Sequence, residues 1–570
     1  MIDHLILGGG SAGCVLAARL SEDPWRRVLL VEAGRDITLA TMPGPIRSRY
    51  PGRAYLDPDN IWAQLTATMG AARGNGPPPP PRRYEQARLL GGGSAINALL
   101  ANRGAPADYD EWGTLGADGW SWDTCLPYFR KLERDCDMSG PLHGRDGPLP
   151  VRRIAKDRLS PFVAAVARTL AARGFAELPD QNGPWADGVY AATLVASEAG
   201  ERVPTAVGYL TPAVRARPNL RILTGHIAER VVFAGARAVG ALVTPTAGGP
   251  AERIEAAEVI LCSGAIHSPA LLLRSGVGPG GDLAALGIPV VADRRGVGRN
   301  LMEHPSIAVS GFLPPRARVR DAAEHHEQAI VRFSSGLPGT PSGDMHGAIL
   351  SRSGWHAIGR RVGTIFFWVN KSYSRGALRL ASADPRAEPA VDFRMLSDAR
   401  DLARLKAALV FGAEILRDPA MGEVCGPVFP ASYSPRVARI ARPGLGRALA
   451  RGAFAGALDG AGPWRAALIH AAVTGGTTLD GLLADDAALT DYVAWNVGGT
   501  WHPTGSCRMG AAGDPLAVTD AAGRVHGTEG LRVCDASLMP SIPCANTNAP
   551  TIMVAERIAD AVRGRPLGAG

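Results

Sequence analysis

The chain has 570 residues, of which 46% are hydrophobic and 20% are charged, and its mean hydropathy is +0.01. These proportions are typical of a globular protein of two to four domains, and they exclude a disordered, collagenous or membrane-spanning chain. The net charge is +8, but the arginines are scattered and often stand beside acids, as in Arg400-Asp401, instead of forming the basic stripe of a nucleic-acid-binding protein. We therefore expect no nucleic-acid partner.

Cysteine usage and the start of the chain bear on the compartment. The eight cysteines include no CxxC pair and are too sparse for a small domain built on disulfides, so we expect reduced, mostly buried thiols. A nucleotide-binding motif begins at Gly8, which leaves no room for the basic and apolar regions of a signal peptide. Apolar runs stay shorter than the roughly 18 residues of a spanning helix. These features predict a cytoplasmic protein.

A glycine-rich turn near the N-terminus predicts dinucleotide binding. His4–Leu7 reads as a short strand, GGGSAG follows at residues 8–13, and Cys14–Leu20 continues as a helix of small residues. In this GxGxxG pattern the first glycine permits the turn, the second lets the backbone approach a pyrophosphate, and the third lets the helix pack on the strand. The start of the helix offers unpaired N–H groups to the anion.

An acidic residue ends the second strand of this unit. Residues 27–31 read as a buried strand that leads into Glu32, nineteen residues after Gly13, where a carboxylate would hold the adenosine ribose hydroxyls. A second GxGxxG match, at 276–281, follows a helix-like stretch and contains Pro279, which lacks a backbone donor, so we interpret it as chance. The contacts predicted from the first motif are Gly8, Gly10, Ser11, Ala12, Gly13, Glu32 and Ala33.

Further signatures follow along the chain. They are RLLGGGSAIN at 88–97, GAIHSP at 264–269, GVGRNL at 296–301 with His-Pro at 304–305, WHPTGS at 501–506, DASLMP at 535–540 and NTNAPTIM at 546–553. Together with the first motif, this ordered set resembles the glucose-methanol-choline (GMC) oxidoreductases, a family of FAD enzymes. The resemblance covers residues 8–553, which is nearly the whole chain.

The resemblance implies the fold and the domains. We expect an α/β (α+β) protein in which a Rossmann-like FAD-binding domain carries a substrate-binding domain built on an antiparallel sheet. The FAD-binding domain would be discontinuous, with residues 1–150, 206–310 and 496–570, and the substrate-binding domain would take residues 151–205 and 311–495. We expect the strands at 372–380 and 391–393 to belong to the sheet that roofs the flavin.

The second glycine segment implies how the flavin is held. In the family this segment runs along the flavin, and members with covalent flavin carry a histidine just before the asparagine. Here Ile96 precedes Asn97, which predicts non-covalent FAD. The additional cofactor contacts implied by the resemblance are Arg88, Gly92, Gly93, Ser94, Asn97, Ala98, Gly264, Asp535, Ala536, Asn546 and Thr547.

Alcohol oxidation removes a hydroxyl proton and a hydride from the same carbon, so the site needs a base at the oxygen. Histidine can accept a proton near neutral pH and then stabilise the developing charge. The resemblance places His502 as this base and Asn546 as the second contact to the same oxygen. His267 and His304 are interpreted as packing or hydrogen-bonding residues near the nucleotide. His325 and His326 are read as surface loop residues, and no metal-ligand spacing is found, so no metal is predicted.

The substrate-facing stretches are most similar to the hydroxymethylfurfural oxidase and aryl-alcohol oxidase-like branch of the family. Members there oxidise aryl and furanyl primary alcohols to aldehydes, and some oxidise hydrated aldehydes further. The implied pocket residues are Val369, Trp501 and Phe367. Trp501 has two open interpretations, one as a stacking residue beside substrate or flavin and one as a core tryptophan.

Two segments depart from the family pattern. Gly74-Asn75-Gly76 and the five prolines at 77–81 form a stiff polyproline stretch where the family has an entrance flap, and the stretch is either a restriction on access or an exposed spacer. Residues 425–475 are rich in Arg, Ala, Gly and Pro. This segment is either a solvated helical excursion or a basic patch that contacts an anionic membrane, and the membrane alternative would place the protein at the periphery of the inner membrane. The arginines singled out there are Arg436, Arg439, Arg442, Arg447 and Arg451.

The leading prediction is FAD-dependent oxidation of an aromatic or furanic primary alcohol, with O2 or a quinone as electron acceptor. Dye- or quinone-linked oxidation of choline, aliphatic alcohols or sugars is an alternative within the family, as is pyridoxine oxidation. Hydroxynitrile lyases and fatty-acid photodecarboxylases share the fold, and they would show no substrate-dependent flavin reduction in the dark. An NAD(P)H-using flavin monooxygenase would need a second nucleotide motif, and the match at 276–281 is a poor one.

Overall fold

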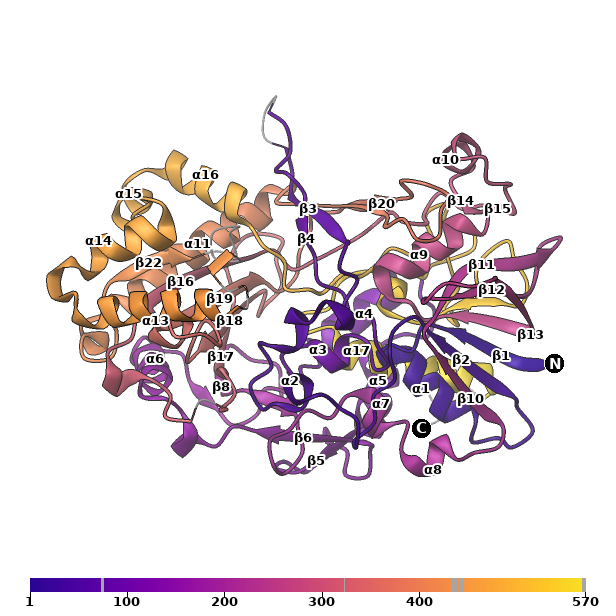
Figure 1. The fold of residues 1–570 in the computed structure, drawn as a ribbon, viewed down its shortest axis with the longest axis horizontal. Helices are drawn as coiled ribbons and strands as arrows, with labels where there is room; N and C mark the ends of the chain where they lie inside the picture. Colours follow the sequence, from indigo (N-terminus) through magenta and orange to yellow (C-terminus); the bar gives the residue numbers. More distant parts are fainter. Residues whose placement is uncertain (73–75, 322, 432–438, 441, 443, 566–570) are drawn as a thin grey trace.

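The computed structural model describes residues 1–72, 76–321, 323–431, 439–440, 442 and 444–565. Gly74, Asn75 and Arg436, which the sequence analysis singled out, lie outside the described residues. Two large sheets lie toward opposite ends of the elongated molecule, and the N-terminus lies at the end that holds the first sheet (Figure 1).

The first sheet carries the nucleotide motif. Its strand order is β10-β2-β1-β13-β12-β11, with β23 paired to β13, and the pairs among β10, β2, β1, β13 and β23 are parallel. Apolar runs such as VLLVE in β2 are buried throughout, as strands covered on both faces require. The strands are β1 Ile2–Leu7, β2 Val28–Glu32, β10 Leu220–Thr224, β11 His226–Ala234, β12 Arg237–Pro245, β13 Glu252–Leu261 and β23 Leu531–Val533.

Two helices start beside the carboxyl end of β1. Helix α1, Ser11–Leu20, begins three residues earlier than the sequence pattern indicated, because Ser11, Ala12 and Gly13 already have helical conformation. It packs on α17, Asn548–Val562, whose residues from Ala549 to Asp560 are all buried. Small side chains on α1 permit this close packing, and Ser11 Oγ donates to Asn548 Oδ1 at 2.7 Å. The start of α17 therefore lies beside the GxGxxG turn.

The second sheet has the order β22-β16-β19-β18-β17-β8-β7, and all its pairs are antiparallel except β7–β8. One face is covered by α11, Ala399–Leu416, and α6, Pro161–Ala172. The strands are β7 Glu177–Leu178, β8 Gly188–Ala191, β16 Ser306–Phe312, β17 Glu327–Phe333, β18 Met345–Leu350, β19 Val362–Val369 and β22 Val428–Ala431. The two sheets are the basis of the domain division that we propose, and β16 begins at Ser306, four residues before its boundary at residue 310.

The strands expected at 372–380 and 391–393 form in part and pair antiparallel with each other, but they do not join the second seven-stranded sheet. Strands β20, Ala377–Arg379, and β21, Ala390–Met395, pair with each other in a separate four-stranded sheet with β3, Thr66–Gly70, and β4, Arg82–Arg83. The physical reason is that the alternation of apolar and polar residues predicts a strand but not its neighbour, and β21 pairs in parallel with a strand far away in sequence. The arm that carries β3 and β4 projects from the body between the two large sheets (Figure 1).

The proline run belongs to this projecting arm. Pro79 is buried and its Cγ lies 3.5 Å from the Cβ position that Gly70 would carry, whereas the other four prolines of 77–81 are exposed. The run is therefore anchored at its middle and solvated on either side.

The remaining helices and strands connect or flank the sheets described above. The helices are α2 Gly44–Arg47, α3 Gly93–Ile96, α4 Pro106–Thr114, α5 Trp122–Leu132, α7 Thr205–Gly208, α8 Pro212–Arg215, α9 Gly264–Arg274, α10 Gly280–Ala285, α13 Leu445–Gly460, α14 Arg465–Ile469, α15 Leu479–Ala484 and α16 Asp486–Asn496. The strands are β5 Glu133–Asp135, β6 Leu149–Arg153, β9 Thr193–Val195, β14 Val277–Gly278 and β15 Ala292–Asp293.

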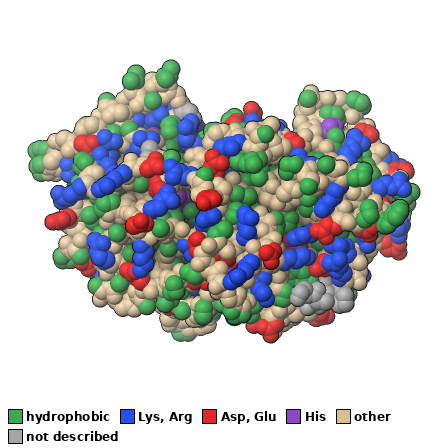
Figure 2. All heavy atoms as spheres, turned by 90° about the horizontal axis from the view of Figure 1, so that it is seen from below, with side chains coloured by type: hydrophobic (Ala, Val, Ile, Leu, Met, Phe, Trp, Pro, Cys, Tyr) green, Lys and Arg blue, Asp and Glu red, His purple; other side chains and the backbone are tan. Residues whose placement is uncertain are grey.

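The state of the cysteines and the distribution of surface charge agree with the expectations drawn from the composition. All eight cysteines are free, and every one except Cys136 is buried. Among the described residues, no helix combines the length and apolar character that crossing a bilayer requires. On the face drawn in Figure 2, basic side chains are interspersed with acidic ones and do not gather into one stripe.

Candidate active site

A long cavity follows the carboxyl edge of the first sheet. Its volume is about 1130 Å³ including the part open to solvent, and both the GxGxxG turn and the loop of the second glycine segment line it. The predicted cofactor residues that line it are Gly8, Gly10, Ser11, Ala12, Glu32, Ala33, Gly92, Gly93, Gly264, Asp535 and Ala536. Residues from four distant parts of the sequence therefore form one site.

Three glycines shape this cavity in different ways. A Cβ on Gly13 would lie 1.9 Å from the carbonyl oxygen of Gly8, so the close approach of α1 to β1 excludes any side chain there. Gly92 has φ +51° and its Cβ would lie 2.6 Å from the Cα of Gly10. Gly10 itself would accept a Cβ, because the nearest atom would be 3.8 Å away. The packing of the protein does not require glycine at position 10, and the space above it belongs to the cavity.

Two buried carboxylates stand on the cavity wall. Glu32 accepts the backbone N–H groups of Gly9 at 2.8 Å and Gly34 at 2.7 Å. Asp535 accepts the N–H of Gly264 at 2.8 Å and the hydroxyl of Ser268 at 2.5 Å. Burial raises the pKa of both carboxyl groups, while these hydrogen bonds act in the opposite direction. Each carboxylate thus fixes a turn that faces the cavity.

Some predicted cofactor residues do not line the long cavity. Ser94 donates to the carbonyl of Gly91 at 2.5 Å, and the Asn97 side chain accepts from Leu99 N at 3.0 Å and Arg202 at 2.6 Å. Ser94 and Asn97 line a small adjoining cavity. The other predicted residues that are absent from the lining of the long cavity are Gly13, Arg88, Ala98, Asn546 and Thr547.

The second glycine segment is held by a buried arginine that the sequence analysis missed. Arg202 donates to the carbonyls of Ser94 and Asn97 and to the Asn97 side chain, and among the described residues it has no carboxylate partner. His325 is buried and bonds the carbonyl of Ala98 at 2.9 Å, so its interpretation as a surface residue is wrong. A His-His pair in a polar stretch gives no sequence signal for such a long-range contact. His326 is only partly exposed.

Other residues on the cavity wall were also missed. They come from loops, a strand end and a helix end that lack a glycine signature, and they are Trp62, Gln86, His226, Arg274, Arg386 and Glu388. His267 lines the cavity as expected for a residue near the nucleotide, and its Nε2 lies 2.9 Å from Glu388.

The two predicted catalytic side chains meet. Asn546 Nδ2 lies 3.3 Å from His502 Nε2, although 44 residues separate them in sequence. His502 is 8% exposed, and burial lowers its pKa to about 3. The imidazole is therefore neutral at physiological pH, which is the state of a proton acceptor.

His304 is a buried hydrogen-bonding residue, as the sequence analysis expected, but its partner is His502 of the His-Pro segment at 502–503. The two Nδ1 atoms lie 2.9 Å apart, and His304 Nε2 lies 3.1 Å from the carbonyl oxygen of Pro543. The reason is the antiparallel pairing of two loops, since Met302 and Thr504 exchange backbone hydrogen bonds. This pairing brings the sequences at 302–305 and 500–504 together, which no short-range pattern shows.

Strand alternation decides which side chains of β19 face the histidine. Trp368 lies 6.5 Å from His502 between ring centroids and stacks on His346 at 4.0 Å. Phe367 points to the other face, where it contacts Phe411 and lies against Gly412 of α11. By the same alternation Val369 shares the face of Phe367. The structure therefore places Trp368 and His346, which the sequence analysis missed, on the side of His502.

Trp501 is a surface-facing residue next to His502 in the sequence. It is 40% exposed, which excludes the alternative of a core tryptophan, and its Nε1 donates to the buried carboxylate of Glu85 at 3.1 Å. Its backbone has φ +61°, a left-handed conformation that costs a residue with a side chain roughly 1–2 kcal/mol.

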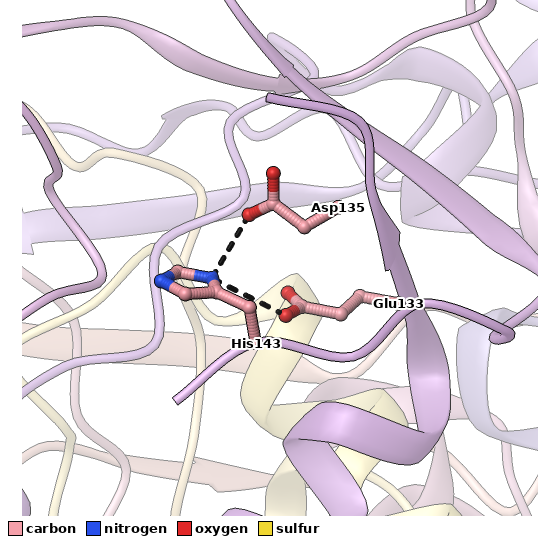
Figure 3. Close-up of side chains that lie close together, drawn as sticks. All are labelled: Glu133, Asp135 and His143. Atoms are coloured by element: carbon pink, nitrogen blue, oxygen red, sulfur yellow. Dashed lines mark ion pairs between the residues drawn. The ribbon is translucent and has the colours of Figure 1, made fainter. Parts of the chain in front are cut away.

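A cluster with metal-ligand chemistry lies away from this site. Glu133, Asp135 and His143 bring their ligand atoms within 4.8 Å of one another (Figure 3). His143 forms ion pairs at 2.9 Å with both Asp135 and Asp180, and the carboxylates also pair with Arg103 and Arg153. Hydrogen bonds that the imidazolium of His143 donates to Asp135, Asp180 and Glu133 raise its pKa to about 10. Three cations therefore already balance three carboxylates, which is the composition of an ion-pair network.

Comparison with known proteins identifies the class. Two family models described as GMC oxidoreductase match residues 2–306 and 372–555. The 5-(hydroxymethyl)furfural oxidase of Methylovorus sp. (strain MP688) is 44% identical over 569 residues, covering 99% of this chain and 98% of the relative. An oxygen-dependent choline dehydrogenase of Burkholderia pseudomallei (strain 1710b) is 35% identical, covering 98% of this chain and 93% of the relative.

Solved structures agree with the sequence comparisons. The crystal structure of pyridoxine 4-oxidase from Mesorbium loti superposes with a TM-score of 0.81 at 27% identity and covers 99% of this chain and 100% of the other. Formate oxidase of Aspergillus oryzae RIB40 has the same fold, with a TM-score of 0.80 at 22% identity, covering 99% of this chain and 98% of the other.

The matching family models, the relatives that cover nearly the whole chain and the shared fold define an FAD-dependent oxidoreductase. The chain belongs to the GMC oxidoreductases, as its motifs predicted, and it is an FAD-dependent alcohol oxidase or dehydrogenase. The predicted α/β (α+β) fold with a Rossmann-like FAD-binding part and an antiparallel sheet is confirmed.

The space above Gly10 gives a test of the cofactor site. Because a Cβ fits there without the cofactor, Gly10→Ala should leave the thermal unfolding of the apoprotein unchanged and weaken FAD binding at least about tenfold, or 1.4 kcal/mol. Gly13→Ala serves as the contrast and should lower the unfolding temperature of the apoprotein as well. Equilibrium dialysis with FAD measures the affinity, and unchanged affinity in Gly10→Ala would place the cofactor elsewhere.

The ion-pair network predicts a pH dependence of stability. The pKa of His143 is raised above its ordinary 6.5, so its contribution is complete below pH 6.5 and is lost as the pH rises through 10. His143→Gln should lower the free energy of unfolding in urea by about 3 kcal/mol at pH 6 and by much less at pH 10. His526→Gln, which loses only a bond to the carbonyl of Gly510, is the control and should show no such trend. An equal loss at both pH values would refute the charged state of His143.

Proposed function

We propose that the chain oxidises an aromatic or furanic primary alcohol to the aldehyde with His502 as the base. The observation that carries this proposal is the 3.3 Å contact between Nε2 of the buried His502 and Nδ2 of Asn546. The 44% identity to a 5-(hydroxymethyl)furfural oxidase supports the furanic substrate class, and the flat rings of Trp368 and His346 supply an aromatic wall beside the histidine.

His502 and Asn546 have different roles in the proposed reaction. A substrate hydroxyl placed between the two side chains would donate its proton to His502 Nε2 and accept a hydrogen bond from the Asn546 amide, which has no tendency to take the proton. Burial of His502 excludes water from the proton's path. FAD, when bound, supplies the acceptor for the hydride.

The residues of the long cavity fit the FAD of this family. We propose that the ADP part is held by the GxGxxG turn, with the pyrophosphate at the start of α1 and the ribose at Glu32. The space above Gly10 supports this placement, since no protein atom needs it. The full set of cofactor contacts proposed from the sequence remains a proposal, and the residues off the cavity wall act through the turns they hold.

We propose that the FAD is not covalently bound. Ile96, which stands just before Asn97, offers no nucleophile to the flavin. Acid precipitation of the purified protein should release the yellow flavin into the supernatant, and flavin retained in the pellet would refute the proposal.

The acceptor is proposed to be O2 or a quinone. The 35% identity to oxygen-dependent choline dehydrogenases makes choline the alternative substrate to test beside the aromatic alcohols. Anaerobic mixing followed by admission of air separates the acceptors, because rapid flavin reoxidation with peroxide indicates an oxidase and slow reoxidation indicates a dehydrogenase. The free state of all eight cysteines supports the cytoplasm as the proposed compartment.

We also propose that α13 makes peripheral contact with an anionic membrane. Residues 425–475 contain six arginines and one acid. Leu445 is 89% exposed and Leu449, one helical turn later, is 78% exposed, while Arg442 and Arg447 beside them are exposed too. Arg451 does not take part, because it is buried and donates to the carbonyls of Ile440 and Arg442. Basic side chains around exposed leucines are the pattern of an interfacial helix.

Loss of the base gives the main test of the function. His502→Ala should keep its bound flavin but reduce it with 5-(hydroxymethyl)furfural or vanillyl alcohol about 10² to 10⁴ times more slowly, because the hydroxyl proton has no acceptor. Anaerobic stopped-flow absorbance measures the rate, and flavin absorbance measures cofactor content. Bleaching at the wild-type rate would remove His502 from the mechanism.

Vesicle flotation tests the membrane proposal. At low salt the protein should float with vesicles that contain phosphatidylglycerol but not with pure phosphatidylcholine, and the double variant Leu445→Glu/Leu449→Glu should stay in solution. Leu516→Glu changes an exposed leucine elsewhere on the chain and should float like the wild type. Absence of flotation of the wild-type protein would rule out the contact.

A further inference from the structure

A buried carboxylate lies behind the proposed base and has no part in the mechanism so far. Glu303 is 3% exposed and accepts hydrogen bonds from the hydroxyl of Tyr84 and from the backbone N–H groups of His304 at 2.8 Å and His502 at 2.9 Å. The hydroxyl of Thr500 also donates to it at 3.0 Å. Burial raises the pKa of Glu303 while these donors oppose the shift, and a group that accepts from so many donors is held as the carboxylate.

The protonation of His304 follows from its partners. His304 Nε2 lies 3.1 Å from the carbonyl oxygen of Pro543, and a carbonyl can only accept, so Nε2 carries the proton. The ring is fully buried, and burial keeps its pKa well below the usual value, so it is neutral. The Nδ1 atom of His304 is therefore a lone-pair acceptor.

Two acceptors then face the same atom of His502. His502 Nδ1 lies 2.9 Å from His304 Nδ1 and 2.7 Å from Thr500 Oγ1. Because the Thr500 proton is directed to Glu303, the hydroxyl oxygen offers a lone pair to His502. Both neighbours thus require a proton on His502 Nδ1, and the lone pair of the neutral ring is left on Nε2. The amide donor of Asn546 on the opposite side of the ring agrees with this arrangement.

We propose that Glu303, acting through Thr500 together with His304, is a positioning group that fixes the Nδ1–H tautomer of His502 and keeps its Nε2 free to accept the substrate proton. This inference rests on the proposed function for the role of His502 as base. When Nε2 takes the proton, the new positive charge is shared toward Nδ1, whose hydrogen bond to Thr500 leads to the Glu303 carboxylate. The arrangement matches an acid–histidine pair with a hydroxyl placed between the two groups.

The same carboxylate holds the backbone of the base. Trp501 is in the left-handed region at φ +61°, which turns the N–H groups of Thr500 and His502 to one side, and Glu303 accepts both, at 3.3 Å and 2.9 Å. Such paired N–H groups form an anion-binding nest. The carboxylate therefore sets the position of the ring as well as its tautomer.

Thr500→Val tests the hydroxyl without disturbing the nest, because valine keeps the shape and the backbone N–H. We expect the rate of flavin reduction by the alcohol to fall about 10- to 100-fold, with substrate KM and FAD content unchanged. Thr504→Val is the matched control: its buried hydroxyl has no hydrogen-bond partner among the described residues, so the rate should stay as in the wild type. A wild-type rate in Thr500→Val and in His304→Phe would overturn the proposal.

The tautomer of His502 can be measured directly, in the absence of enzymatic turnover. Solid-state ¹⁵N NMR of the FAD-loaded protein labelled at histidine, with the His502→Asn spectrum subtracted for assignment, should show Nδ1 protonated and Nε2 unprotonated. The double variant Thr500→Val/His304→Phe should show a mixture of both tautomers. A proton on Nε2 in the wild type would overturn the proposal, and a single tautomer in the double variant would do so too. The spectrum is independent of the role of His502, so wild-type bleaching in His502→Ala would refute only the proposed function.

Discussion

The buried carboxylate of Glu303 is the interaction on which the arrangement of the site depends. Its donors come from the arm with β3 and β4 through Tyr84, from its own loop through His304, and from the loop at 500–502. A carboxylate removed from water costs several kcal/mol unless donors replace the lost hydration. The charge therefore requires each of these donors, and the shared carboxylate holds three distant segments of the chain together.

Buried guanidinium groups elsewhere in the molecule also need hydrogen-bond partners to replace their lost hydration. Only four lysines accompany the arginines of this chain, and several arginines are fully buried. Arg332 donates to the carbonyls of Gln181 and Ala186 and lies 3.6 Å above the ring of Trp185. A planar group with five donors and a weakly hydrated face can be satisfied by carbonyls and an aromatic ring, whereas an ammonium cannot. The arginine-rich composition therefore supports the core and does not require a polyanionic partner.

The nucleotide half of the site could be predicted from sequence because its determinants are local. A strand, a glycine turn and a helix follow one another within twenty residues, and Glu32 ends the next strand, so one unit of chain encodes the geometry. The catalytic half could not be derived in that way. His304 meets His502 only because their loops run side by side, and His325 reaches Ala98 across 227 residues. Pairing of distant segments is set by tertiary packing, which leaves no periodic trace in the sequence.

Strand β19 shows most clearly what could not be predicted from the sequence. The family resemblance pointed to the right strand but to the wrong face of it, since Phe367 packs on α11 while its neighbour Trp368 faces His502. Alternation makes the two faces of a strand equivalent until the position of the covering helix is known, and both residues are large and aromatic. A shift of one residue in the strand's register would exchange them. The packing of α11 and α6 on the far side of the sheet therefore decides which side chains of β19 face His502.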